Sequence, residues 1–258
     1  MDPTAIALCD FKGQIAKHDL SRFKCIFDDQ LLLGFLNGKK FDVSSALGCL
    51  NDYVYVRTTK HQTWTKTNLL PSVVTFPLGK RFNILKNKDV KGNLVVIDSG
   101  NLWHTTSTTY DEILTEMLFV ADELIRTYLV DSESNEVTLI CDGEGLSIRH
   151  SLIRTPSRVM KMMDLLLKSV PIRPAGIHLI NAGPIISFLS RIATGFLPEK
   201  IRQRVFIHPN LHSLYEHVPK SILPAGIGGA LSNEEAIEED LGQRIEHRDE
   251  FYRLMFNM

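Results

Sequence analysis

Four short apolar runs alternate with amphipathic segments after residue 91, and this alternation constrains the fold more than any other feature of the sequence. Runs of this length, bounded by glycine or polar residues, are typical of strands buried on both faces. The segments between them carry apolar residues at the spacing of helices. This order predicts an α/β fold with a mainly parallel sheet and crossover helices. The predicted strands are 92–100, 136–145, 175–183 and 204–210, and the predicted helices are 110–130, 155–170 and 184–197.

The first part of the chain follows a different pattern. Leucine and phenylalanine recur at helical spacing between residues 31 and 36, and Asp42 is placed to cap the next helix. We expect residues 1–65 to form a small all-α N-terminal unit. Prolines and a glycine interrupt residues 66–90, which we interpret as a linker region. Residues 91–258 then form the second domain, with a helix near its C-terminus.

The composition argues against several classes of protein. The 29 Lys and Arg against 30 Asp and Glu leave no overall positive field for nucleic acid. The four cysteines lack CxxC spacing and the nine histidines form no HExxH set, so we expect free thiols and no metal. No apolar run approaches the roughly 18–20 residues of a membrane span, and the N-terminus lacks a secretory pattern. We therefore expect a soluble cytoplasmic protein that needs no cofactor and contacts membranes only transiently, at their surface.

Motifs for catalysis are missing from the sequence. It contains no GxSxG, no GxGxxG and no GxxxxGK[ST] pattern. Asp142 and Glu144 follow a predicted strand and could pair as acid and base, but such acids more often stabilise a turn. We expect that the protein is not an enzyme.

The stretch "GPIISFLSRIATGFLPEK" (183–200) is unusually apolar for a helix of a soluble protein. At about 100° per residue, its aliphatic and aromatic side chains cover an arc of roughly 180°. Cations follow at Lys200, Arg202 and Arg204. The pattern alone allows a core helix with a solvated basic end, or a mobile apolar element that meets an anionic membrane.

Several stretches resemble the CRAL-TRIO family, which includes cellular retinaldehyde-binding and tocopherol transfer proteins. They are "LICDGEGLS" (139–147), "VPIRPAGIHLINAGP" (170–184), "GFLPEKIRQRVFIH" (195–208) and "LYEHVPKSILPAGIGG" (214–229). The stretch "DDQLLLGFLNGKKFDVSSALGCL" resembles the small helical unit that precedes the lipid-binding domain of this family. The resemblance implies a mainly parallel sheet floor with helices on one side and a helical gate over an apolar cavity. Residues 184–197 would be the gate.

The resemblance assigns roles to two sets of residues. One set would line the cavity around a small hydrophobic ligand, and the other would bind phosphoinositide headgroups at an anionic membrane surface. The expected cavity residues are Leu114, Met117, Leu118, Ala121, Ile140, Val159, Met163, Ile177, Ile185, Phe188, Leu189, Ile192 and Phe196. The expected phosphoinositide-binding residues are Lys39, Lys40, Arg173, Lys200 and Arg204.

Four positions depart from the family pattern. Members that carry phosphatidylinositol tend to have Glu and Lys where this chain has Ile172 and Thr194, which argues against an inositol ring inside the cavity. Ala175 and Asn37 replace basic residues of the surface cleft that the retinaldehyde and tocopherol branch carries, so this cleft is only partly kept.

The prediction is a soluble carrier for a retinoid, a tocopherol-like isoprenoid, a carotenoid or a sterol, which it transfers between membranes with the help of phosphoinositides. Two alternatives stay open. One is a phospholipid exchange protein of the same fold, and the other is a trafficking adaptor that reads phosphoinositides.

Overall fold

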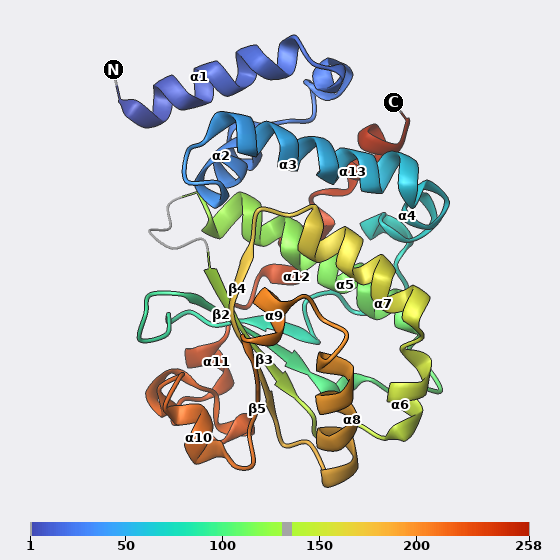
Figure 1. The fold of residues 1–258 in the computed structure, drawn as a ribbon, viewed down its shortest axis with the longest axis vertical. Coiled ribbons are helices and arrows are strands. Elements are labelled where there is room, and N and C mark those ends of the chain that lie inside the picture. Colours follow the sequence, from blue (N-terminus) through green and yellow to red (C-terminus); the bar gives the residue numbers. More distant parts are fainter. Residues whose placement is uncertain (1, 131–135, 258) are drawn as a thin grey trace.

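The apolar runs form a five-stranded sheet, and the strands lie side by side in sequence order (Figure 1). The computed structural model describes residues 2–130 and 136–257. β2 to β5 are parallel, as the alternation predicts, and β1 is antiparallel to β2. The strands are β1 (Phe82–Ile84), β2 (Leu94–Ser99), β3 (Glu136–Asp142), β4 (Arg173–Ile180) and β5 (Val205–Ile207). β1 falls inside the range interpreted as a linker, because a three-residue strand leaves no apolar run to detect.

Helices connect the parallel strands, and two of them continue as π-helical segments. α5 begins with a complete capping box between Thr109 and Glu112. α7 has proline in its first turn, as the sequence predicts. The connections are α5 (Tyr110–Glu123) with the π segment Leu124–Tyr128; α6 (Ile148–Ile153) and α7 (Pro156–Met162) with the π segment Met163–Lys168; and α8 (Pro184–Thr194) with α9 (Glu199–Arg202).

The N-terminal unit is helical, as predicted. The side chains of Asp28 and Asp42 accept hydrogen bonds from the backbone at the start of α2 and α3. Its helices are α1 (Pro3–Ala16), α2 (Asp29–Gly38), α3 (Val43–Tyr55) and α4 (Gln62–Asn68). One hydrophobic cluster runs from these helices through α5 to the C-terminal helices α12 (Leu241–Glu246) and α13 (Asp249–Asn257). Figure 1 shows α13 beside the N-terminal helices, at one end of the molecule.

The opposite face of the sheet is also covered. Ile97, Ile140 and Ile180 pack there against Leu214 and Leu223 in a second hydrophobic cluster. The covering elements include α10 (Leu211–Tyr215) and α11 (Asn233–Ala236). The resemblance implied helices on one side only; the structure has a helical layer on one face and short helices with turns on the other.

Candidate functional site

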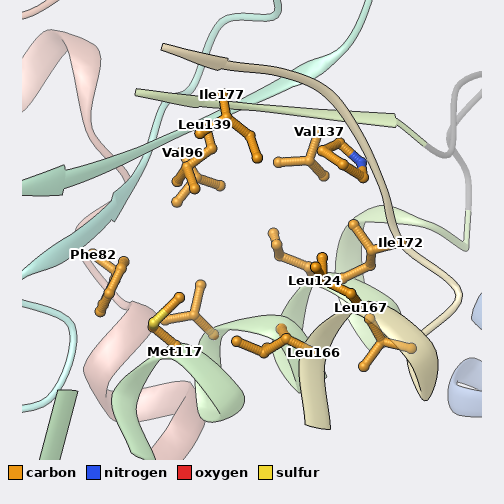
Figure 2. Close-up of a pocket in the computed structure, with 14 residues that line it drawn as sticks. Phe82, Val96, Met117, Leu124, Val137, Leu139, Leu166, Leu167, Ile172 and Ile177 are labelled. Atoms are coloured by element: carbon orange, nitrogen blue, oxygen red, sulfur yellow. The ribbon is translucent and has the colours of Figure 1, made fainter. Parts of the chain in front are cut away.

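A cavity of about 150 Å³ lies between the sheet and the helical layer. Figure 2 shows its side chains converging from the strands on one side and from α5 and the second π segment on the other. No charged side chain is among the residues that line it. They are Phe82, Val96, Met117, Val120, Ala121, Leu124, Val137, Leu139, Leu166, Leu167, Val170, Ile172, Pro174 and Ile177.

Strand geometry decides which residues reach this cavity. Side chains alternate between faces along a strand, so Val137 and Leu139 of β3 both point into it. On β4, Pro174 and Ile177 both line the cavity although they are three positions apart, a spacing that places side chains of a regular strand on opposite faces. The register with β3 shifts at this point, where Val137 pairs with Pro174 and Thr138 with Gly176. Ala175 is the extra residue of a β-bulge, and this bulge turns the side chain of Ile177 back toward the cavity.

Three of the predicted cavity residues, Met117, Ala121 and Ile177, line the cavity. Leu114 and Leu118 are also on α5 but are buried in the hydrophobic cluster that joins α5 to the N-terminal helices. The strand parity places Ile140 on the opposite face of the sheet, so its prediction as a lining residue is wrong for this cavity.

Val159 and Met163 lie half-buried along α7 and the π segment that follows it, and neither reaches the lining. The lining residues that the prediction did not include come from β1 to β3, from α5 with its π segment, and from residues 166–174. Alternation along β2 and β3 could have found Val96 and Leu139. The connection before β4 follows no period, so periodicity marks neither Val170 nor Ile172, and only the comparison with the family pattern singles out Ile172.

The predicted gate residues do not face this cavity in the structure. α8 contacts α6 and the edge strand β5 instead. Ile186 is its buried residue, whereas Leu189 is half-buried. The other predicted gate residues are exposed, Ile185 by 58%, Phe188 by 61%, Ile192 by 50% and Phe196 by 82%. The expectation that this stripe lines the cavity is therefore corrected: α8 presents it to solvent.

The neighbouring helix α6 adds to this apolar surface. Ile148 is 49% exposed and Leu152 is 74% exposed. We call the exposed apolar side chains of α6 and α8, with Phe196, the apolar face. Arg149, Arg154 and Arg191 lie on the same two helices or next to them, and neither helix contains Asp or Glu.

The predicted phosphoinositide-binding residues lie on segments that the fold brings together. α2 ends against the segment before β4, because a Cβ at Gly38 would lie 2.4 Å from the Cβ of Pro171. This contact places the turn with Lys39 and Lys40 near the start of β4, where Arg173 lies. We call Lys39, Lys40, Arg173, Lys200 and Arg204 the basic cluster.

The remaining cations of the basic cluster come from the connection between α8 and β5. Arg204 donates a hydrogen bond to the carbonyl oxygen of Pro174 (2.5 Å) and lies 3.7 Å from the carboxylate of Glu136. Lys200 is exposed on α9. The ion pair with Glu136 compensates part of the charge of Arg204, so the cluster is weaker than its cation count indicates.

The model of the CRAL/TRIO domain matches residues 78–229, which is more than half of the chain. The chain belongs to the CRAL/TRIO domain family. The crystal structure of Sfh5 shares the fold with this CRAL/TRIO chain, with a TM-score of 0.57 and 12% identity over 96% of this chain and 97% of that one.

Curated proteins are similar over most of this CRAL/TRIO chain. The alpha-tocopherol transfer protein-like protein of Homo sapiens is 30% identical over 204 residues, which are 78% of this chain and 58% of that protein. Clavesin-1 of Xenopus laevis is 28% identical over 206 residues, which are 79% of this chain and 61% of that protein. The chain thus spans about three fifths of the length of these relatives.

Two further features of the CRAL/TRIO chain bear on its chemistry. Within residues 2–130 and 136–257, no helix combines the length and apolarity needed to cross a bilayer, and no three His, Cys, Asp or Glu side chains are grouped to hold a metal ion. The carboxylate of Asp142 accepts hydrogen bonds from the amide of Asn181 (3.0 Å) and the backbone N–H of Glu144 (3.2 Å). These contacts are those of an acid that stabilises a turn.

Proposed function

We propose that the protein is a carrier that binds one small hydrophobic molecule, such as a retinoid, a tocopherol-like isoprenoid, a carotenoid or a sterol, and transfers it between membranes. The observation that carries the proposal is the cavity with an entirely apolar set of lining side chains. Burial of apolar surface is worth about 25 cal/mol per Å². A few hundred Å² of ligand surface therefore supply several kcal/mol for binding.

The cavity has to expand to hold a ligand of this class. Its volume of about 150 Å³ is below the roughly 300–1,000 Å³ of typical ligand pockets. Both helical walls include π-helical segments: Leu124 lies on one, and Leu166 and Leu167 lie on the other. Such segments occur often at functional sites and depart from regular α-helical hydrogen bonding. We propose that they change shape when the ligand enters.

Ile172 supports a hydrophobic ligand over a phospholipid with an inositol ring. It stands where phosphatidylinositol carriers tend to have Glu, and here its apolar side chain lines the cavity. A buried inositol headgroup would need polar partners, because a polar group without hydrogen bonds is costly in an apolar site. The lining of this cavity supplies none from side chains.

We further propose that the apolar face of α6 and α8 contacts the bilayer during transfer. Contiguous exposed apolar side chains are rare on monomeric proteins and mark interaction sites. The arginines on the same helices favour an anionic surface, since no acid on either helix offsets them. The basic cluster would add binding to phosphoinositide headgroups through charge-assisted hydrogen bonds. Membrane association is then transient and peripheral.

The experiment is organic extraction of the purified protein and mass spectrometry of the extract, followed by competition with retinoids, tocopherols, carotenoids, sterols and phospholipids. One stoichiometric isoprenoid, retinoid, carotenoid or sterol supports the carrier. A mixture of phospholipids would instead indicate an exchange protein. No lipid and no competitor binding would indicate the phosphoinositide-reading adaptor.

A cavity-filling substitution sharpens this test. We predict that Ala121→Phe reduces ligand binding at least tenfold, because the larger side chain occupies the space that the ligand needs, while liposome binding persists. Ala5→Phe on the exposed surface of α1 is the matched control. Wild-type ligand affinity in Ala121→Phe would contradict the assignment of the cavity as the ligand site.

A further inference from the structure

An ion pair lies just beyond the apolar cavity, toward the carboxyl ends of the parallel strands. Asp98 is two residues past the cavity-lining Val96 on β2, so the two side chains share a face. Asp98 is also the register partner of Phe82, which lines the cavity from β1. Arg81 precedes Phe82, and its Nη2 lies 2.6 Å from Oδ1 of Asp98. The charged pair thus borders the lining residues Phe82 and Val96, although neither Arg81 nor Asp98 lines the cavity itself.

Contacts on three sides hold Arg81 in place. Oε1 of Glu116 accepts hydrogen bonds from the backbone N–H groups of Gly79 (3.1 Å) and Arg81 (3.4 Å). The guanidinium carbon lies 5.5 Å from the ring centre of Phe82 and 5.6 Å from that of Trp103. With the carboxylate of Asp98 on the third side, the guanidinium is fixed before any ligand arrives, and such preorganisation lowers the entropy cost of binding.

The guanidinium has donors that the protein does not use. Arg81 is 5% exposed, and its Nε and Nη1 have no acceptor among the described residues. Native proteins satisfy most buried polar groups, so unused buried donors call for an explanation. An arginine offers donors only, which means that the missing partner must be an acceptor.

The charges around Arg81 decide which acceptor fits. Asp98 already balances the guanidinium, so a carboxylate on the ligand would place a second negative charge beside the first. Arg154 adds a second positive charge nearby, with its guanidinium 5.2 Å from the ring centre of Trp103, and the carboxylate of Asp142 adds a second negative charge. Asp142, the next acid along the strand ends, is occupied by Asn181 and the backbone of Glu144. A neutral oxygen can accept from Nε or Nη1 without disturbing the pair.

We propose that Arg81 and Asp98 form a subsite for the polar end of the ligand, and that this end is a neutral oxygen acceptor, a carbonyl or hydroxyl group. This inference rests on the carrier function proposed above and specifies its ligand. The apolar body of the ligand occupies the cavity, and its oxygen passes Phe82 to reach Arg81. The subsite therefore selects an amphipathic molecule over a pure hydrocarbon.

The test uses four probes with one carbon skeleton: retinal, retinol, retinoic acid and the hydrocarbon axerophthene. Binding is measured by fluorescence titration of the intact protein. For the wild type we expect retinal and retinol to bind about 10- to 100-fold more tightly than the hydrocarbon, the range for a hydrogen bond to a charged donor. Retinoic acid should bind more weakly than retinal.

Two variants separate the roles of the pair. The double substitution Arg81→Met with Asp98→Leu replaces the ion pair by apolar side chains, which proteins often tolerate. It should abolish the preference for retinal over the hydrocarbon without weakening hydrocarbon binding. Asp98→Asn keeps the donors and removes the negative charge, so it should shift the preference toward retinoic acid by about tenfold or more. As the control, Arg248→Met with Glu123→Leu removes an ion pair between α5 and the turn before α13.

Each outcome decides between the two proposals. If the wild type and the Arg81→Met/Asp98→Leu variant bind all four probes with the same preferences, the subsite is overturned and the carrier function stands. If Asp98→Asn leaves the rank of retinoic acid unchanged, the neutral character of the subsite is wrong. If the wild type binds none of the four probes, and the extraction and competition experiment above also finds no tocopherol, carotenoid or sterol, the carrier function itself is contradicted.

Discussion

Glu116 shows how one buried side chain can make stability depend on pH. The carboxylate is 3% exposed and accepts backbone hydrogen bonds from Gly79 and Arg81. Burial raises the pKa of Glu116 from an ordinary value near 4.5 to about 7, more than these hydrogen bonds and the charge of Arg81 lower it. The folded protein therefore binds this proton more tightly than the unfolded chain does. The stability that comes from protonated Glu116 is fully present below about pH 4.5 and is lost as the pH rises to about 7.

We predict that Glu116→Gln weakens this pH dependence. Glutamine keeps an oxygen that can accept from Gly79 and Arg81, and it carries no charge whose burial costs free energy. The shift of the pKa corresponds to up to about 3 kcal/mol of unfolding free energy between pH 4.5 and pH 7.5. Chemical denaturation across this range should show a smaller loss of stability in the variant. Glu246→Gln on the exposed surface of α12 should follow the wild type. Parallel pH profiles for Glu116→Gln and the wild type would contradict the prediction.

The residue patterns predicted the helices and strands better than they predicted the face on which each side chain lies. The cap at Asp42 and the apolar runs of β2 to β4 are local signals, and the structure confirms the elements that they predict. The facing of Ile177 depends on the bulge at Ala175, and the role of Ile172 depends on a connection without periodicity. These are tertiary features, because the partner strand and the packing of the π segments determine them. The family resemblance therefore predicts that an apolar cavity is present, but the sequence predicts only part of the set of residues that line it.

At the scale of elements, α8 is the helix whose surface least resembles that of an ordinary soluble helix. We predict that Phe188→Asp lowers binding to liposomes of anionic phospholipid about tenfold or more, because it replaces an apolar contact with a charge that the bilayer disfavours. Transfer between vesicles should slow in parallel. Phe188 is largely exposed, so the fold should keep its stability.

Ser190→Asp is the matched control for this prediction, since it adds the same charge to the half-buried polar side of α8. Flotation with sucrose-loaded vesicles measures the binding, and thermal unfolding measures stability. Equal liposome binding by Phe188→Asp and the wild type would mean that the apolar face has another partner.

The basic cluster lies where three parts of the fold meet: the end of α2, the start of β4, and the connection between α8 and β5. We predict that Lys200→Ala with Arg204→Ala weakens binding to liposomes that contain phosphoinositides about 30-fold, because the two lost cations are worth roughly 1 kcal/mol each near a charged surface. Ligand uptake should be unchanged, because neither residue lines the cavity. The control Lys66→Ala with Lys220→Ala removes the same charge from exposed positions elsewhere. If both double variants lose the same affinity, net charge and not the cluster determines binding.

For the whole molecule, the N-terminal and C-terminal helices together fix the helix that forms one cavity wall. Arg57, just after α3, pairs with Asp122 of α5 at 3.1 Å, and the hydroxyl of Tyr252 on α13 donates to the same carboxylate at 2.8 Å. All three side chains are buried. The division of the chain into two domains at residues 66–90 stays a prediction. In the structure, one hydrophobic cluster includes residues from before, within and after this range. Breaking such a buried pair would leave an uncompensated charge, so α5 is held firmly.

Because α5 is fixed, we expect most of the expansion of the cavity to come from the other helical part of its wall, α7 and the π segment that follows it. α7 has no buried residue, and the π segment that follows it carries Leu166 and Leu167 into the cavity. Elements with few buried contacts open at the lowest free energy. We predict that ligand binding changes amide hydrogen exchange most in residues 156–172 and least in α5 between residues 113 and 123. Hydrogen-exchange mass spectrometry of the ligand-free and loaded protein measures this. The largest change within α5 would mean that the clamp by Arg57 and Tyr252 releases on loading, and that the two ends of the chain take part in admitting the ligand.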